Sequence, residues 1–160
     1  MNNALLKLLF FFLMLVILGV AVYSQSFVKS YREYCKAESV FRRAQHGNPR
    51  AQNKLGQMYL RGEGVPRNNY EAIKWFRMAA NQKFSKAQFN LGIIYYEGQG
   101  VPRDYVLAYL WFNLGSFNAT GKDNEATTKH LEKLNEKMTP EQIAKAKHLL
   151  LEWKTNGTND

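Results

Sequence analysis

The sequence predicts an all-α protein, with one apolar N-terminal helix followed by a solenoid of helix pairs. Three observations predict it: an uninterrupted apolar run from Leu8 to Tyr23, a self-match with a period of 36 residues, and apolar stripes at helical spacing within each period. The 160 residues are 46% hydrophobic and 22% charged, which excludes a mainly disordered chain. A single cysteine, Cys35, excludes the small disulfide-stapled class.

The first element is a membrane segment. Counted over residues 4–23, and broken only by Lys7, the apolar stretch makes a helix about 30 Å long, enough to cross a bilayer. We therefore expect residues 1–24 to be a single-pass anchor. A signal peptide is the alternative, because Val22-Tyr23-Ser24 passes as a weak cleavage site. The anchor predicts a membrane protein, and cleavage predicts a periplasmic or secreted one.

A basic juxtamembrane helix is expected next, over residues 25–43, with Phe27, Tyr31, Tyr34 and Phe41 roughly on one side. Lys and Arg outnumber acidic residues on this flank of the span, which favours a cytoplasmic C-terminal part. A signal peptide would place the same part outside the cell. The sequence leaves the two orientations open.

The body of the chain repeats itself. Shifted by 36 residues, AQNKLGQMYLRGEGVPRN at 51–68 lies on AQFNLGIIYYEGQGVPRD at 87–104. A fixed period in this range is typical of stacked supersecondary units. We place one repeat at 44–80 and a second at 81–116. The framework positions are Ala51, Leu55, Gly56, Tyr59, Gly62, Gly64, Pro66 and Trp75, then Leu91, Gly92, Tyr95, Gly98, Gly100, Pro102 and Trp111.

Each unit reads as helix, loop, helix. The four-residue spacing of Ala51, Leu55 and Tyr59 predicts the buried stripe of a first helix. Gly56 lies on that stripe, and close approach of a neighbouring helix explains a glycine there. Gly62 follows the stripe, where the residue after a helix often adopts a left-handed conformation.

The second helix of each unit is expected to begin after Asn68 or Asp104 as N-cap. Its buried face is supplied by alternating small and large residues. In the first unit these are Ala72, Trp75, Phe76 and Ala79.

Both repeats contain the string A-Q-x-x-L-G-x-x-Y-x-x-G-x-G-V-P-R, followed by A-x-x-W-F. This pattern resembles the Sel1-like repeats, relatives of the tetratricopeptide repeats. The resemblance covers roughly residues 44–155. It implies a right-handed superhelical solenoid of antiparallel helix pairs and a role in binding other proteins.

The C-terminal part departs from the repeat, because the Gly-x-Gly-Val-Pro loop is missing there. We expect a degenerate helical cap over 117–155, with a helix at 123–138 and a final helix that starts at Thr139-Pro140-Glu141-Gln142. Residues 156–160 are expected to form a disordered tail.

The sequence shows no convincing catalytic, cofactor or metal site. Ser26 and Lys29 match the S-x-x-K pattern of penicillin-interacting serine enzymes, but its partner motifs are missing, so a β-lactam or cell-wall enzyme is disfavoured. The three histidines have no ligand spacing with one another or with Cys35. No catalytic, metal or cofactor residue is assigned.

Positive charge is concentrated in residues 24–86, which hold 13 Lys and Arg against 4 Asp and Glu. The candidate basic surface comprises Arg42, Arg43, Arg50, Lys54, Arg61, Lys74 and Arg77. One interpretation is a solvated face, and another is attraction to anionic lipid, peptidoglycan or an acidic protein. Nucleic acid is disfavoured, because no groove-reading motif is present.

A second candidate surface lies where aligned positions of the two first helices differ. These positions are Asn53, Gln57, Leu60, Phe89, Ile93 and Tyr96. By analogy with tetratricopeptide solenoids they line a partner-binding face, but the favoured interpretation is that the large ones pack against the helix at 123–138. Together the features predict a non-catalytic scaffold for protein–protein interaction in the bacterial cell envelope, with its partner unnamed.

Overall fold

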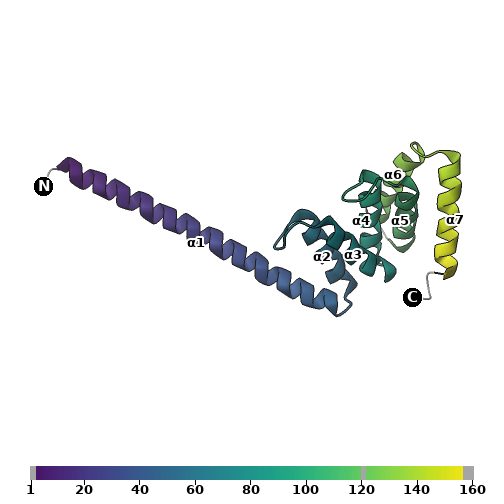
Figure 1. The fold of residues 1–160 in the computed structure, drawn as a ribbon, viewed down its shortest axis with the longest axis horizontal. Coiled ribbons are helices and arrows are strands. Elements are labelled where there is room, and N and C mark those ends of the chain that lie inside the picture. Colours follow the sequence, from purple (N-terminus) through teal and green to yellow (C-terminus); the bar gives the residue numbers. More distant parts are fainter. Residues whose placement is uncertain (1–2, 120–121, 157–160) are drawn as a thin grey trace. The chain divides into compact units, whose positions relative to one another are not determined.

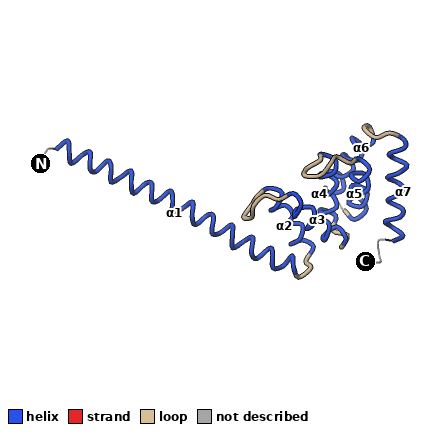
Figure 2. The backbone as a smooth tube through the Cα atoms, viewed as in Figure 1, coloured by secondary structure: helices blue, strands red, loops and turns tan. Residues whose placement is uncertain are grey.

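A computed structural model describes residues 3–119 and 122–156, and all regular secondary structure in these ranges is helical (Figures 1 and 2). The expected all-α class is therefore confirmed. Of the expected disordered tail over 156–160, Asn156 is the last residue of the final helix, and residues 157–160 lie outside the described ranges. The helices are α1 (Asn3–Gln45), α2 (Pro49–Arg61), α3 (Asn69–Asn81), α4 (Ser85–Glu97), α5 (Tyr105–Asn118), α6 (Lys122–Asn135) and α7 (Pro140–Asn156).

The chain divides into two compact units, Met1–Lys36 and Ala37–Asp160. Helix α1 runs through this boundary without interruption. The sequence analysis treated residues 1–24 and 25–43 as separate segments. No Gly or Pro lies between Ser24 and Gln45 to stop a helix, so the apolar and amphipathic segments join into one.

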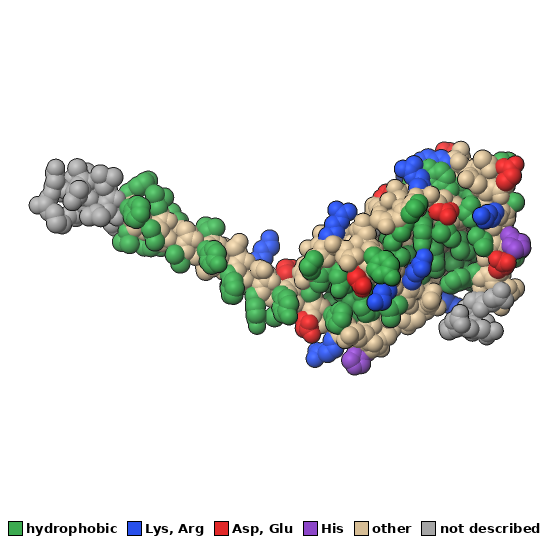
Figure 3. Space-filling view, viewed as in Figure 1, with side chains coloured by type: hydrophobic (Ala, Val, Ile, Leu, Met, Phe, Trp, Pro, Cys, Tyr) green, Lys and Arg blue, Asp and Glu red, His purple; other side chains and the backbone are tan. Residues whose placement is uncertain are grey.

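The first unit presents its apolar side chains to its surroundings. From Phe11 onward the large hydrophobic residues of this segment are exposed, and Figure 3 shows hydrophobic side chains all along it. An 18-residue window of this segment has a mean hydropathy of 2.1, and the segment is long enough to cross a membrane. A signal sequence has the same length and composition, so the helix fits either an anchor or a signal.

The second unit contains two helix pairs built in the same way. Helices α2 and α4 both end at a glycine with positive φ, Gly62 at 72° and Gly98 at 76°. Helices α3 and α5 both begin after a capping side chain. Asn68 Oδ1 accepts the Glu71 N–H at 3.1 Å, and Asp104 Oδ1 accepts the Leu107 N–H at 3.0 Å.

A glycine and a phenylalanine interlock the helices of each pair. A Cβ atom on Gly56 would lie 2.8 Å from the Phe76 ring, and one on Gly92 would lie 2.4 Å from the Phe112 ring. Both rings are fully buried. The first helix of each pair therefore approaches the second closely enough that no side chain fits at the glycine.

The last turns of α1 close the first end of the repeats. Val40 and Ala44 are buried with Leu55 of α2 and Trp75 of α3, and Phe41 meets the Trp75 ring edge-on at 5.9 Å. Trp75 is 7% exposed. The amphipathic end of α1 therefore covers an apolar face that the first repeat leaves open.

Helices α6 and α7 close the other end. Trp111 of α5, 6% exposed, meets Trp153 of α7 edge-on at 5.3 Å. Helix α6 ends at Asn135, three residues earlier than expected, and the chain turns so that Met138 is buried beyond the helix. Thr139 and Gln142 then cap α7 reciprocally, each side chain accepting the other's backbone N–H.

Candidate interaction surfaces

Two buried glutamines tie each repeat to the helix before it. Gln52 Nε2 donates to the Ala44 carbonyl, and Gln88 Nε2 donates to the Ala80 carbonyl, both at 3.2 Å. Their Oε1 atoms accept from Gln82 at 2.7 Å and from Asn118 at 3.1 Å. The sequence analysis gave these glutamines no role, although their identity across the 36-residue shift was a usable signal. They satisfy buried carbonyl groups and fix the register between repeats.

On α4, the proposed partner-binding residues contact the C-terminal cap. The Phe89 ring meets the His130 ring of α6 edge-on at 5.3 Å and the Phe112 ring at 5.7 Å. Ile93 is half-buried and packs against the main core. The Phe89 ring therefore packs against α6, which covers most of the helix expected over 123–138.

Tyr96 is held by a residue that follows α6. Lys137 Nζ donates to Tyr96 Oη at 2.7 Å and lies 4.8 Å from the centre of the same ring. This hydrogen bond raises the pKa of Lys137 above its ordinary value. The Tyr96 ring also packs against Tyr105 and Phe112. The Lys137 ammonium group is therefore held beside the Tyr96 hydroxyl group.

On α2, the three candidate positions have different surroundings. Asn53 is buried, and its Oδ1 accepts from Asn90 Nδ2 of α4 at 2.8 Å, which joins the two first helices. Gln57 and Leu60 are half-buried on the same helix. Of the six candidate positions, Asn53 is therefore buried. The other five, Gln57, Leu60, Phe89, Ile93 and Tyr96, are half-buried and partly accessible.

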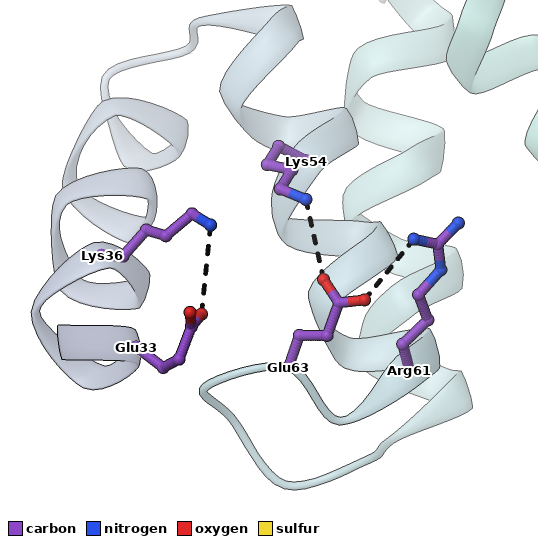
Figure 4. Close-up of polar contacts among 5 residues, drawn as sticks. All are labelled: Glu33, Lys36, Lys54, Arg61 and Glu63. Carbon is purple, nitrogen blue, oxygen red and sulfur yellow. Dashed lines mark hydrogen bonds and ion pairs between the residues drawn. The ribbon is translucent and has the colours of Figure 1, made fainter. Parts of the chain in front are cut away.

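Part of the candidate basic surface is neutralised by carboxylates. Glu63, in the loop after α2, lies 3.7 Å from Lys54 Nζ and 3.5 Å from Arg61 Nη1 (Figure 4). Lys74 lies 3.8 Å from Glu71 on α3. Because these pairs are largely exposed, they contribute little to stability but reduce the local positive charge.

The remaining arginines fall into two groups. Arg77 Nη2 donates to Tyr95 Oη at 2.6 Å, linking α3 to α4. Arg42, Arg43 and Arg50 are exposed at the end of α1 and the start of α2. Arg77 thus makes a contact between helices, Arg43 Nε donates to the Ser39 carbonyl of its own helix at 3.3 Å, and all three exposed arginines are accessible to an anionic surface.

An open pocket of about 250 Å³ lies between the α3–α4 turn, α5 and α7. Phe117 on its edge is 79% exposed, and Lys154 Nζ lies 5.3 Å from the centre of that ring. Lys83, in the turn, is the one described non-glycine residue with a positive φ, at 61°. The pocket combines an apolar wall with two lysines, and the sequence analysis did not anticipate it.

The histidines and the cysteine considered for metal binding form no cluster in the described part of the chain. Within the described ranges no group of three or more His, Cys, Asp and Glu side chains is placed to hold a metal ion. Cys35 is exposed on α1. His46 and His130 each place Nδ1 near a backbone carbonyl four residues earlier, at 2.7 Å and 2.8 Å.

The Sel1 repeat family model matches residues 49–84 and 85–116. Each matched segment begins with the first helix of a pair, α2 or α4. No curated protein matched the sequence.

Two solved structures show the same architecture. A protective antigen of uropathogenic Escherichia coli strains, which displays an SLR fold, is 38% identical over 73% of this chain, with a TM-score of 0.68. A Sel1 repeat protein from Oxalobacter formigenes is 36% identical over 52% of this chain, with a TM-score of 0.51. This chain spans 24% of the first protein's length and 63% of the second's.

Proposed function

Since this chain is a Sel1-repeat protein, we propose that it is a non-catalytic scaffold that binds another protein and is held at the bacterial cell envelope by its N-terminal helix. The repeat architecture supports the binding role, and the apolar length of α1 supports the tether. The observation that carries the proposal is the rigid stacking of the helix pairs. Because the glycine–phenylalanine contact recurs in both helix pairs and Asn53 bonds to Asn90, the first helices α2 and α4 are held in fixed positions.

The proposed docking surface comprises Gln57, Leu60, Ile93 and Tyr96. They lie at positions that differ between the two repeats, and they stay half-buried while the framework positions beside them are largely buried. Half-buried apolar and amide side chains on a rigid surface lose little freedom on binding. The Lys137 ammonium group beside Tyr96 favours a partner with a carboxylate at the edge of its contact.

Site-specific photo-crosslinking in native membranes tests this surface. A photoreactive phenylalanine is introduced at Gln57 or at Tyr96 of the full chain. The matched control position is Tyr70 at the start of α3, which is 76% exposed. We expect a discrete protein adduct from Gln57 and Tyr96 and none from Tyr70. Adducts from Tyr70 alone, or from no position, would count against the proposed surface.

Association with anionic lipid is a second candidate, supported by the exposed Arg42, Arg43 and Arg50 near the start of the second unit. Each basic residue close to an anionic surface contributes about 1 kcal/mol of binding free energy at most. Flotation of the compact unit 37–160 with anionic vesicles, after circular dichroism has shown that it is folded, measures this. Binding should fall steeply as the salt concentration rises from about 0.1 M to about 1 M, because the Debye length shrinks over this range from about 10 Å to about 3 Å. Binding that ignores salt would remove this candidate.

A further inference from the structure

An aromatic stripe runs along the part of α1 that follows its apolar run. Tyr23, Phe27, Tyr31 and Tyr34 recur at spacings of four, four and three residues, which places them on one face of the helix. Each exposes between 62% and 77% of its surface. The stripe extends over about 16 Å of helix at 1.5 Å per residue.

Between Tyr23 and Lys36, charge is confined to the other faces of the helix. Lys29, Arg32 and Lys36 fall on the side opposite the stripe by the same helical spacing, and Glu33 lies 4.0 Å from Lys36 Nζ (Figure 4). The positions that flank the stripe, such as Ser24 and Ser30, are uncharged. Two identical stripes can therefore meet without bringing like charges together.

We propose that a second copy of this chain covers the stripe, so that two α1 helices pair in parallel along Tyr23, Phe27, Tyr31 and Tyr34. This rests on the proposed membrane anchor, because helices inserted in the same bilayer run in the same direction and present the same face at the same height. In that geometry each aromatic residue meets its own counterpart, as in an isologous interface.

The line of contact between the two helices, here called the seam, continues into the apolar run. Leu13, Val16 and Val20 precede Tyr23 at spacings of three, four and three residues, and all three are exposed. Alternating spacings of three and four residues are the pattern of parallel helix pairs that supercoil with a left hand. The same face can therefore pack against its counterpart both inside and beyond the bilayer.

The area of the stripe is sufficient for a specific contact. An aromatic side chain buries about 150–250 Å², and about two-thirds of each of the four is free to be covered. If two copies covered all of this area they would bury at most about 1,000 Å² outside the bilayer, which is about the minimum expected of a biological interface. The contact between the apolar runs adds to this.

Lipid alone does not cover the stripe. If the apolar run ends at the hydrocarbon boundary near Tyr23, the headgroup layer extends only about 5–7 Å further. Tyr31 and Tyr34 lie about 12 and 16 Å beyond Tyr23 along the helix. The outer half of the stripe is therefore in water unless another helix covers it.

Cysteine cross-linking of the full chain in native membranes tests the pairing. In a Cys35→Ser background, single cysteines replace Phe27, Tyr31 or Tyr34, with matched controls at Gln25, Lys29 and Arg32. A short bismaleimide then joins neighbouring thiols. We expect covalent dimers from the stripe positions in several-fold excess over the controls. Equal yields at all positions, or none, would overturn the pairing.

A second pair of variants separates pairing from chance proximity. Tyr31→Lys should abolish the cross-link at position 27, because it brings two ammonium groups into the seam, and Gln25→Lys should leave it intact. The size of the monomer on the same gel reports the state of the anchor. A full-length chain without cross-links refutes the pairing alone, whereas a chain beginning at Gln25 removes the anchor on which the pairing rests.

Discussion

The two interlocked glycines set the spacing of the helix pairs. Gly92 lies against the ring of Phe112 and Gly56 against the ring of Phe76, each on the buried face of its first helix. A glycine inside a helix costs about 1 kcal/mol relative to alanine. The close approach of the rings offsets this, since their burial contributes more than the helix loses at the glycine.

Gly92→Ala should therefore destabilise the second unit despite alanine's higher helix propensity. The new methyl group would sit 2.4 Å from a fully buried ring, and overpacking of this kind costs about 1–3 kcal/mol. In a Phe112→Leu background the same change should instead stabilise, because the ring is gone. Urea unfolding of the four proteins measures both effects, and a destabilisation that persists in the leucine background would contradict the interlock.

Trp75 has a buried indole nitrogen for which the structure shows no hydrogen-bond partner. Trp75→Ala should cost about 3–5 kcal/mol of unfolding free energy, because it leaves a large cavity between α1, α2 and α3. Trp75→Phe should cost far less, because it keeps the ring contact with Phe41 and removes the unsatisfied N–H group. Equal losses for the two variants, measured by chemical denaturation, would contradict this account of the Trp75 site.

At the scale of elements, the start of α7 shows how a local sequence signal determines a boundary. Thr139 and Gln142 exchange hydrogen bonds with each other's backbone N–H groups. The Thr139 hydroxyl and a backbone N–H also lower the pKa of Glu141 below its ordinary value. A carboxylate with a depressed pKa contributes stability above its unfolded pKa and loses that contribution as pH falls through its folded pKa.

Thr139→Ala should destabilise the unit by about 1 kcal/mol through loss of the cap. It should also return the pKa of Glu141 toward its ordinary value, so that less stability is lost on acidification through that range. Thr139→Ser, which keeps the hydroxyl, is the control. Urea unfolding at several pH values and an NMR titration of Glu141 check both effects, and an unchanged Glu141 titration in the alanine variant would contradict the assignment.

The repeats were predictable from the sequence because each boundary carries its own signal. A glycine with positive φ ends each first helix, and an Asn or Asp side chain begins each second one. The end of α6 carries no such signal, since Met138 continues an apolar spacing although it packs from a turn. The end was therefore predicted three residues too late.

The candidate binding residues were less predictable, because their accessibility depends on contacts between distant parts of the chain. Asn53 is buried through a hydrogen bond to Asn90, and Phe89 packs against His130, 41 residues later. A residue that differs between the two repeats is not needed for the packing that both repeats share. Such a difference does not distinguish a free surface from a contact that only one repeat makes.

At the scale of the whole chain, the apolar and repeat units have separate roles in the proposed function. The unit Met1–Lys36 supplies the membrane contact and the aromatic stripe, and the unit Ala37–Asp160 supplies the stacked helices. Helix α1 runs from the apolar segment to Gln45, so its last turns contribute Val40 and Ala44 to the first core cluster. Removal of residues up to Lys36 should leave the second unit folded, since that core begins at Ala37.

Intact-mass spectrometry of the protein extracted from cell membranes tests the tether most directly. After an alkaline carbonate wash removes peripheral proteins, we expect the membrane fraction to retain a chain that includes residues 4–23. A mature chain that begins at Gln25, recovered in the soluble fraction, would show that the apolar helix is a signal and would contradict the account of a tethered scaffold.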